Sequence, residues 1–384
     1  MNRVYKVIWS KVRNCYVAVS EIAKNHAKCS IGAGSSVVRG VLAGAVLLSL
    51  TAGVCAPVWA NVEVGSGTAT GSGTATNGSL GVVVIGDNAK TLSVSHAGIA
   101  IGANADVEKL AGIAIGADSV VKDQYGISVG RIAEANGYQS ISIGSGSSEI
   151  FEGDGIATIA DGYQSIAIGA RAKATEDYAT VLGTDARVAE GAQFSTAIGH
   201  NSSVDGSGLS TVVGEDAHVI GVNNSAFGKS STVGSGYNAN EWRYTTAVNN
   251  SSAYGTESHV FGDTSVAIGQ NSSVGGYQKW NATDNKWDVV EVSGDTYYKH
   301  NNTAVGQNAR IYAAQGVALG QGSTAGFLYK RPSTGETYEQ TASNATAVGQ
   351  YARVYAPQGI ALGQSSQVGE VRLRYLNTNT GKYE

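Results

Sequence analysis

The pentad Gly98-Ile99-Ala100-Ile101-Gly102 recurs as Gly112-Ile113-Ala114-Ile115-Gly116 and again as Gly126-Ile127-Ser128-Val129-Gly130. The closing glycines of these three copies follow one another at a fixed period of fourteen. Fifteen steps separate successive closing glycines from Gly86 to Gly363, and eight of these steps equal that period. A period held over this length predicts a solenoid of stacked coils.

The composition of one repeat predicts two short strands and two turns. Residues of the pentad alternate between two faces of a strand, and the glycine allows a positive φ or a close backbone approach. Asn, Asp or Ser beside the glycine suits a turn, and a second strand follows, as in 103–107 and 271–275. We therefore predict an all-β chain with little helix.

One face of such a coil is predicted to stay bare in a single chain. Alanine and glycine fill the inside, while isoleucine and valine on the other face gain roughly 1.5–3 kcal/mol each when they are buried. A continuous apolar stripe normally marks an interface, and cyclic self-association covers it most simply. The predicted interface and core residues are Ile99, Ile101, Ile113, Ile115, Ile166, Ile168, Ile198, Ile268, Leu319 and Leu362.

The charge distribution disfavours nucleic acid as a partner. Residues 1–60 hold seven of the 26 basic residues and one of the 30 acidic residues, so 19 basic and 29 acidic residues remain, a net charge of −10. A surface of this sign repels phosphate backbones.

The N-terminal region is predicted to be a signal peptide that is cut between Ala60 and Asn61. A basic start precedes an apolar run over 41–55, and the small residues Val58 and Ala60 occupy positions −3 and −1 of the cut. One alternative is a membrane anchor, but about 15 apolar residues are too few to span a bilayer. The other is a lipoprotein modified at Cys55, but Val54 stands where a lipoprotein signal needs Gly, Ala or Ser. All three cysteines precede the cut, so the mature chain lacks thiols.

The N-terminal region and the repeat each resemble a known family. The segments 1–9, 13–17, 20–21 and 23–26 are similar to the extended signal peptide region of type V secretion substrates, which implies Sec export to a Gram-negative surface. The repeat, with its Ser-x-Ala-Ile-Gly core, resembles the YadA-like head of trimeric autotransporter adhesins. That resemblance implies a left-handed parallel β-roll in a homotrimer.

The expected organisation is an extended signal peptide at 1–60, a flexible Gly/Ser/Thr-rich segment at 61–79 and head repeats at 80–369. Insertions are expected near 145–160, 235–250, 275–302 and 325–343, and a further hairpin begins at 370–384, where we expect the reading frame to be truncated. Aromatic or charged arms around turn residues predict β-hairpins there. Their aromatic residues either shield the trimer or contact a ligand, and the candidate ligand surface is Trp280, Trp287, Tyr297, Tyr298, Tyr329 and Tyr338.

The function predicted from these features is attachment of a bacterial surface to host cells, extracellular matrix or other bacteria. A structural or self-aggregation coat is the alternative, and the sequence does not choose between them. No catalytic constellation, cofactor motif or metal site is expected, because His96, His200, His218, His259 and His300 are scattered and read as turn or surface residues. A β-helical enzyme would need six-residue sub-periods or clustered charged residues on one face, and neither occurs.

Overall fold

The computed structural model describes residues 5–10, 15–20, 62–64, 68–69, 81–92, 96–146, 157–206, 208–238, 243–281, 286–291, 299–330, 337–371, 376–377 and 382–383. The chain divides into two units, 1–55 and 56–384. In the first unit, β1 (Tyr5–Ser10) pairs antiparallel with β2 (Cys15–Ser20). Among the described residues, no helix is long and apolar enough to span a membrane.

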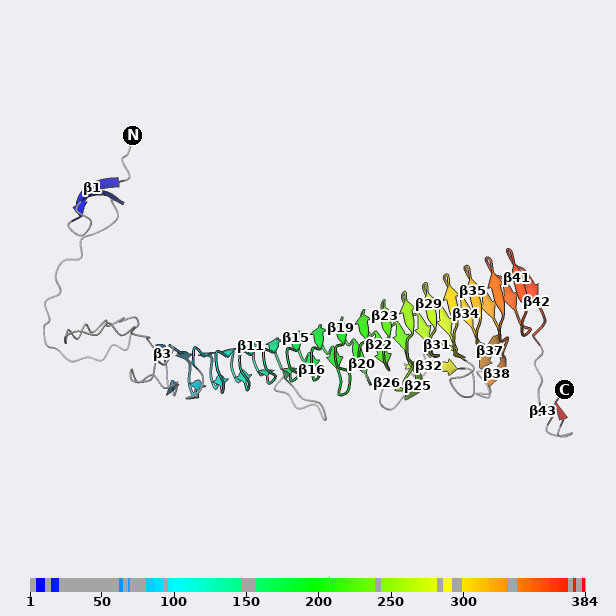
Figure 1. The fold of residues 1–384 in the computed structure, drawn as a ribbon, viewed down its shortest axis with the longest axis horizontal. Coiled ribbons are helices and arrows are strands. Elements are labelled where there is room, and N and C mark those ends of the chain that lie inside the picture. The colour runs from blue at the N-terminus through cyan, green and yellow to red at the C-terminus, as the bar shows by residue number, and fades with distance from the viewer. Residues whose placement is uncertain are drawn as a thin grey trace. The chain divides into compact units, whose positions relative to one another are not determined.

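The second unit is an all-β solenoid whose coils each supply one strand to each of two parallel sheets (Figure 1). Within the described residues, each sheet contains 17 strands. In coil order, the first sheet consists of β3 (Val62–Val64), β5 (Val83–Ile85), β7 (Ile99–Ile101), β9 (Ile113–Ile115), β11 (Ile127–Val129), β13 (Ile141–Ile143), β15 (Ile166–Ile168), β17 (Thr180–Leu182), β19 (Thr196–Ile198), β21 (Thr211–Val213), β23 (Ser225–Phe227), β27 (Ser252–Tyr254), β29 (Val266–Ile268), β33 (Thr303–Val305), β35 (Val317–Leu319), β39 (Thr346–Val348) and β41 (Ile360–Leu362).

The second sheet lies on the other side of the coils and is made of shorter strands. In coil order it consists of β4 (Thr68–Ala69), β6 (Lys90–Thr91), β8 (Asp106–Val107), β10 (Val120–Val121), β12 (Ala133–Ala135), β14 (Thr158–Ala160), β16 (Lys173–Ala174), β18 (Arg187–Val188), β20 (Ser203–Asp205), β22 (His218–Ile220), β24 (Thr232–Val233), β28 (His259–Val260), β30 (Ser273–Val274), β34 (Arg310–Ile311), β36 (Thr324–Ala325), β40 (Arg353–Val354) and β42 (Gln367–Val368).

The sequence period sets the register between coils. Ile99 pairs with Ile113 and Ile101 with Ile115, each one period further along the chain. The Ile113 backbone N–H donates to the carbonyl of Gly126 in the next coil at 2.9 Å, so every coil is hydrogen-bonded to its neighbours. The predicted solenoid of fourteen-residue repeats is confirmed.

The core is a narrow column of small side chains. In the first-sheet strands from β5 to β41 the central residue points inward, and Ala100, Ala114 and Val181 are fully buried. Val107 and Val121 of the second sheet meet Ala100 and Ala114 from the opposite side. Because the coil has so little internal width, alanine and valine fill it, and the flanking isoleucines remain on the outer side of the first sheet.

In the coils whose turns the structure describes, both turns contain a left-handed residue. The first turn runs from a first-sheet strand to the second sheet, and the second turn leads to the next coil. In a regular stretch the left-handed residues are seven apart: Asn104 (φ 58°), Ala111 (φ 53°), Asp118 (φ 58°) and Tyr125 (φ 60°). Asn and Asp tolerate this conformation, which accounts for their frequency after the closing glycine.

The coils begin earlier than the sequence period indicated. β3 and β4 lie in the segment 61–79, for which we expected a flexible chain, yet β3 pairs in parallel with β5 and β4 with β6. Val62-Glu63-Val64-Gly65 is a version of the pentad, but the step from Gly65 to Gly86 is half as long again as the period. Because this step is irregular, the period did not predict the first coil.

Candidate functional site

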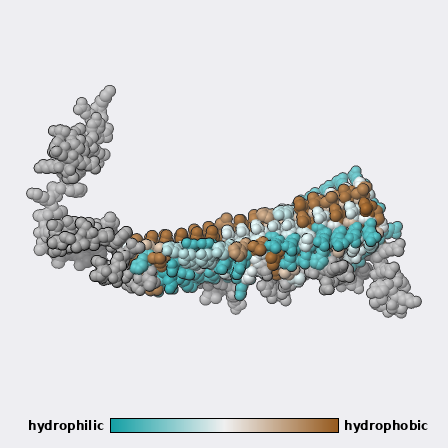
Figure 2. All heavy atoms as spheres, viewed as in Figure 1, coloured by the Kyte–Doolittle hydropathy of each residue, from teal (hydrophilic) through white to brown (hydrophobic). Residues whose placement is uncertain are grey.

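The residues predicted to form the self-association interface lie in one face of the first sheet. They occupy the first and third positions of its strands, and Ile115, Ile268 and Leu362 are 37%, 41% and 66% exposed. The other seven predicted residues are half-buried. Figure 2 shows the resulting hydrophobic band along the side of the coils where the first sheet lies, with a paler stretch in the middle.

The paler stretch has a simple origin in the sequence. The first strand position there is a hydroxyl residue in five successive coils: Thr180, Thr196, Thr211, Ser225 and Ser252. The third position stays apolar and includes the stacked pair Phe227 and Tyr254, whose ring centroids are 5.2 Å apart. The apolar face is therefore continuous along its third column.

Antiparallel strand pairs follow particular strands of the second sheet. They are β25 (Ser235–Asn238) with β26 (Arg243–Thr246), β31 (Gly276–Asn281) with β32 (Lys286–Glu291), and β37 (Phe327–Lys330) with β38 (Thr337–Gln340). A fourth pair joins β43 (Leu376–Asn377) to β44 (Lys382–Tyr383). β31 lies against β28 and β30, and β26 lies against β22, so these pairs adjoin the second sheet.

Glycine and aromatic residues alternate after successive second-sheet strands in this region. Gly234, Gly275, Gly326 and Gly369 follow β24, β30, β36 and β42, whereas Phe261, Tyr312 and Tyr355 follow the intervening strands β28, β34 and β40. These three aromatic side chains are 0%, 3% and 9% exposed. An antiparallel pair thus leaves every second coil, a spacing of about 10 Å that matches the distance between packed sheets. β32 indeed lies against β37.

Four of the six candidate ligand residues belong to these strand pairs. Trp280 and Trp287 are register partners across β31 and β32, and Tyr329 and Tyr338 are partners across β37 and β38. Tyr297 and Tyr298 lie outside the described residues, as does the predicted cut between Ala60 and Asn61.

A row of five aromatic side chains, four of them exposed, lies on the second turns of five other coils and was not found from the sequence. We call Tyr125, Tyr138, Tyr163, Tyr178 and Phe194 the aromatic strip. Adjacent ring centroids are 5.7, 5.2, 5.5 and 4.8 Å apart. Tyr125, Tyr163, Tyr178 and Phe194 are 43%, 39%, 43% and 55% exposed. The signal available in the sequence was an aromatic residue one or two positions before the pentad in successive repeats.

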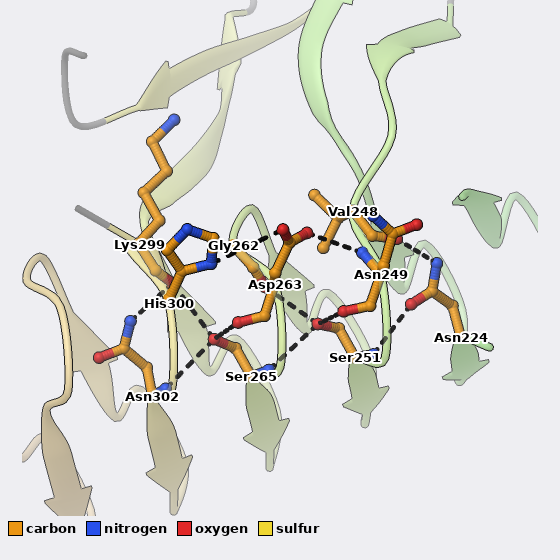
Figure 3. Close-up of polar contacts among 10 residues, drawn as sticks. All are labelled: Asn224, Val248, Asn249, Ser251, Gly262, Asp263, Ser265, Lys299, His300 and Asn302. Atoms are coloured by element: carbon orange, nitrogen blue, oxygen red, sulfur yellow. Dashed lines mark hydrogen bonds and ion pairs between the residues drawn. The ribbon is translucent and has the colours of Figure 1, made fainter. Parts of the chain in front are cut away.

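Further along the solenoid, buried polar side chains connect the second turns (Figure 3). The Ser251 hydroxyl accepts the backbone N–H of Ser265 at 3.1 Å, and the Ser265 hydroxyl accepts that of Asn302 at 3.2 Å. Asp263 accepts the backbone N–H of Asn249 at 2.8 Å, and its other oxygen lies 3.7 Å from His300 Nδ1. These polar side chains form hydrogen bonds between neighbouring coils, so we assign them a structural role.

Two histidines occupy strands, which corrects the expectation that all five mature histidines are turn or surface residues. His259 in β28 is 1% exposed, and its Nδ1 lies 2.7 Å from the Thr232 hydroxyl. Burial lowers the pKa of His259 to about 3, and the charge of Arg310 acts in the same direction. Burial also lowers the pKa of His218 in β22. Within the described residues, no cluster of His, Cys, Asp and Glu has the arrangement of a metal site.

Charged side chains on the second sheet and first turns form pairs between coils. Lys90 lies 2.8 Å from Asp106, and Arg187 lies 3.2 Å from Asp205. Arg171 donates two hydrogen bonds of 2.5 Å to Asp185, which lower the pKa of that carboxyl. Exposed pairs of this kind contribute about 0–1 kcal/mol each.

Two protein-family models match segments of this chain. Residues 1–52 match the extended signal peptide of the type V secretion system. The YadA head domain repeat matches residues 124–147, 160–186, 249–272 and 341–366. Together these matches indicate a trimeric autotransporter adhesin. The adhesin is exported through Sec and displayed at the cell surface. No curated protein matches the chain.

Proposed function

We propose that the adhesin's head is a homotrimer of left-handed β-rolls, decorated by hairpin insertions, that attaches bacteria to host cells, extracellular matrix or other bacteria. The observation that carries the proposal is the apolar face of the first sheet, which runs from Ile99 to Leu362 in the single chain. Faces of this extent on secreted proteins mark interaction surfaces.

Self-association explains this face better than a foreign ligand does. The same apolar column repeats in coil after coil, so a copy of the chain in the same orientation offers a matching column at every level. A closed cyclic assembly covers the face of every subunit equally, whereas an open one leaves an end exposed. The number of three subunits follows from the family.

The antiparallel strand pairs supply the candidate ligand surface of the proposed head. Trp and Tyr dominate binding hot spots, and the Trp280–Trp287 and Tyr329–Tyr338 register pairs concentrate these residues on adjacent hairpins. We propose no catalytic activity and no cofactor. A structural or self-aggregation coat remains the second candidate, since the same apolar and aromatic features serve contacts between bacteria.

The experiment that tests the trimer replaces Ile101, Ile115 and Ile168 with Asp. These side chains lie outside the coil's own core, so the change puts no charge into that core, but an interface between chains acquires three buried charges from each subunit. A chain whose stability depends on covering this face should therefore unfold when assembly is lost. The expected result is loss of both assembly and the folded β signal, measured by sedimentation and circular dichroism.

A matched control introduces Asp at Val120 and Ile159, which are half-buried positions on the second sheet. That variant should still assemble. A well-folded monomer from the first-sheet variant would contradict the proposed obligate trimer.

A further inference from the structure

The aromatic strip is an apolar surface that the described part of the chain leaves uncovered. Its five rings contact one another along five coils, yet four of them remain 39% to 55% exposed. The interplanar angles alternate between edge contacts, at 86° and 62°, and stacked contacts, at 9° and 8°. Contiguous exposed apolar surface of this kind is characteristic of a binding site.

The second turns that carry the strip are acidic. They span 122–126, 136–140, 161–165, 175–179 and 189–195, and within these ranges Lys122 is the single basic residue against five carboxylates. The carboxylates are Asp123, Asp161, Glu176, Asp177 and Glu190. Asp161 and Asp177 are exposed and directly precede Gly162-Tyr163 and Tyr178. The strip therefore combines aromatic surface with negative charge along its edge.

Two basic side chains close to the strip already pair with carboxylates. Lys122 lies 3.3 Å from Glu134, and Arg187 lies 3.2 Å from Asp205. Lys173 lines a shallow hollow together with Glu176 and Glu190. The local balance of charge at the strip remains negative.

The stem and the charged head of a long basic side chain are both complementary to this surface. The methylene stem of lysine or arginine packs on apolar surface while its charged head stays at the polar rim. Aromatic rings attract cations, and carboxylates form charge-assisted hydrogen bonds with them. We propose that the aromatic strip is a docking surface for an extended segment of another protein that is rich in lysine or arginine.

This inference deepens the proposed attachment role, on which it rests, and names the partner by its chemistry. It concerns coils that precede the strand pairs bearing Trp280 and Tyr329, so the two candidate surfaces are separable by mutation. Peptide binding by the purified secreted chain tests the strip itself, whereas the attachment of whole cells tests the proposed function.

The experiment measures the fluorescence anisotropy of a labelled peptide of alternating lysine and alanine, with a glutamate–alanine peptide as the counterpart. The wild-type chain should bind the lysine peptide, less tightly at high salt, and not the glutamate peptide. Tyr163→Ser with Tyr178→Ser leaves the net charge unchanged and should weaken binding about tenfold. Binding unaffected by this change would overturn the proposal.

A second variant retains the rings. Asp161→Asn with Asp177→Asn preserves oxygen acceptors for the Asn136 side chain and the Tyr163 backbone N–H, and it should weaken binding to a similar degree. Glu215→Gln with Glu257→Gln removes the same charge from first turns and should leave affinity nearly unchanged. Equal losses from the two charge pairs would mean nonspecific attraction to an acidic protein and would overturn the proposal.

Two further outcomes would also contradict the proposed partner. Tyrosine-dependent binding of a neutral oligosaccharide, with no response to the lysine peptide, would assign the strip to glycans. Dissociation of the assembly by Tyr163→Ser with Tyr178→Ser, seen by sedimentation, would assign the strip to a contact between subunits. An intact assembly that loses only the lysine peptide supports the proposal.

Discussion

A Cβ atom added to Gly306 would lie 2.5 Å from the carbonyl oxygen of Gly320, the closing glycine of the next coil. Gly306 also has a φ of 134°, a conformation that residues with side chains rarely adopt. Both constraints recur at the closing glycines of other coils, for example at Gly255 with Gly269. The glycine column thus brings the backbones of adjacent coils together at the start of the first turn.

Gly306→Ala should therefore destabilise the head strongly, because the substitution adds a backbone clash to an unfavourable φ. We expect a loss of more than about 2 kcal/mol in the free energy of unfolding, measured by denaturant titration. Gly363→Ala is the matched control, since Gly363 has a φ of 108° but no atom of the described chain within 4 Å of the added Cβ. Equal losses from the two variants would show that backbone strain alone is responsible.

The hydroxyl of Ser265 is predicted to stabilise the stacking of coils. It accepts the Asn302 N–H at 3.2 Å and donates to the carbonyl of Asp263 at 2.9 Å. Ser265→Ala should lower the free energy of unfolding by about 1–3 kcal/mol because buried partners lose their hydrogen bonds. Ser231 is also fully buried, but its hydroxyl has no partner among the described residues, so Ser231→Ala should be neutral or stabilising. The reverse order of the two melting temperatures would contradict this.

His259 should make the stability of the head depend on pH. The folded-state pKa is about 3 and the ordinary value is 6.5, so between these values the unfolded chain binds a proton that the folded chain does not. The contribution of the neutral imidazole is therefore fully present above pH 6.5 and is lost as the pH falls toward 3, at up to about 1.4 kcal/mol per pH unit. His259→Asn should flatten this slope in denaturant titrations across that range.

The sequence predicted the coil, its period and the inward alanines because each repeats in fixed register with a glycine. The aromatic strip was missed because Tyr125 directly precedes its pentad whereas Tyr138 and Tyr163 stand two positions before theirs. The first coil at 62–69 was missed because its closing glycine is out of period. The alternation of Gly275 with Tyr312 was not predicted, because each of these residues follows a strand of only two residues. Strands this short leave no recognisable pattern in the sequence.

Export of the adhesin should remove the segment 1–60. N-terminal sequencing of the surface material should begin at Asn61, because Val58 and Ala60 provide the small residues that signal peptidase requires. Ala60→Leu should slow the cut and leave a longer product, while Val58→Ala should leave it unchanged. Mature surface material that still begins at Met1 would contradict the predicted signal peptide.

Trp280 and Trp287 offer the most direct test of the ligand surface. They are register partners in the antiparallel pair that follows Gly275, so removing both changes one strand pair and no coil strand. If they contact a ligand, Trp280→Ala with Trp287→Ala should reduce the attachment of displaying cells while the melting temperature stays nearly constant. The neighbouring register pair is the control: Lys279→Ala with Asp288→Ala leaves the net charge unchanged and should preserve attachment.

A lower melting temperature, with attachment falling only in proportion to it, would assign the tryptophans to the packing of the strand pair. Clumping of displaying cells without host material, abolished by the same double variant, would show that the partner is another bacterium. Unchanged melting together with unchanged attachment would remove this strand pair from the binding surface altogether.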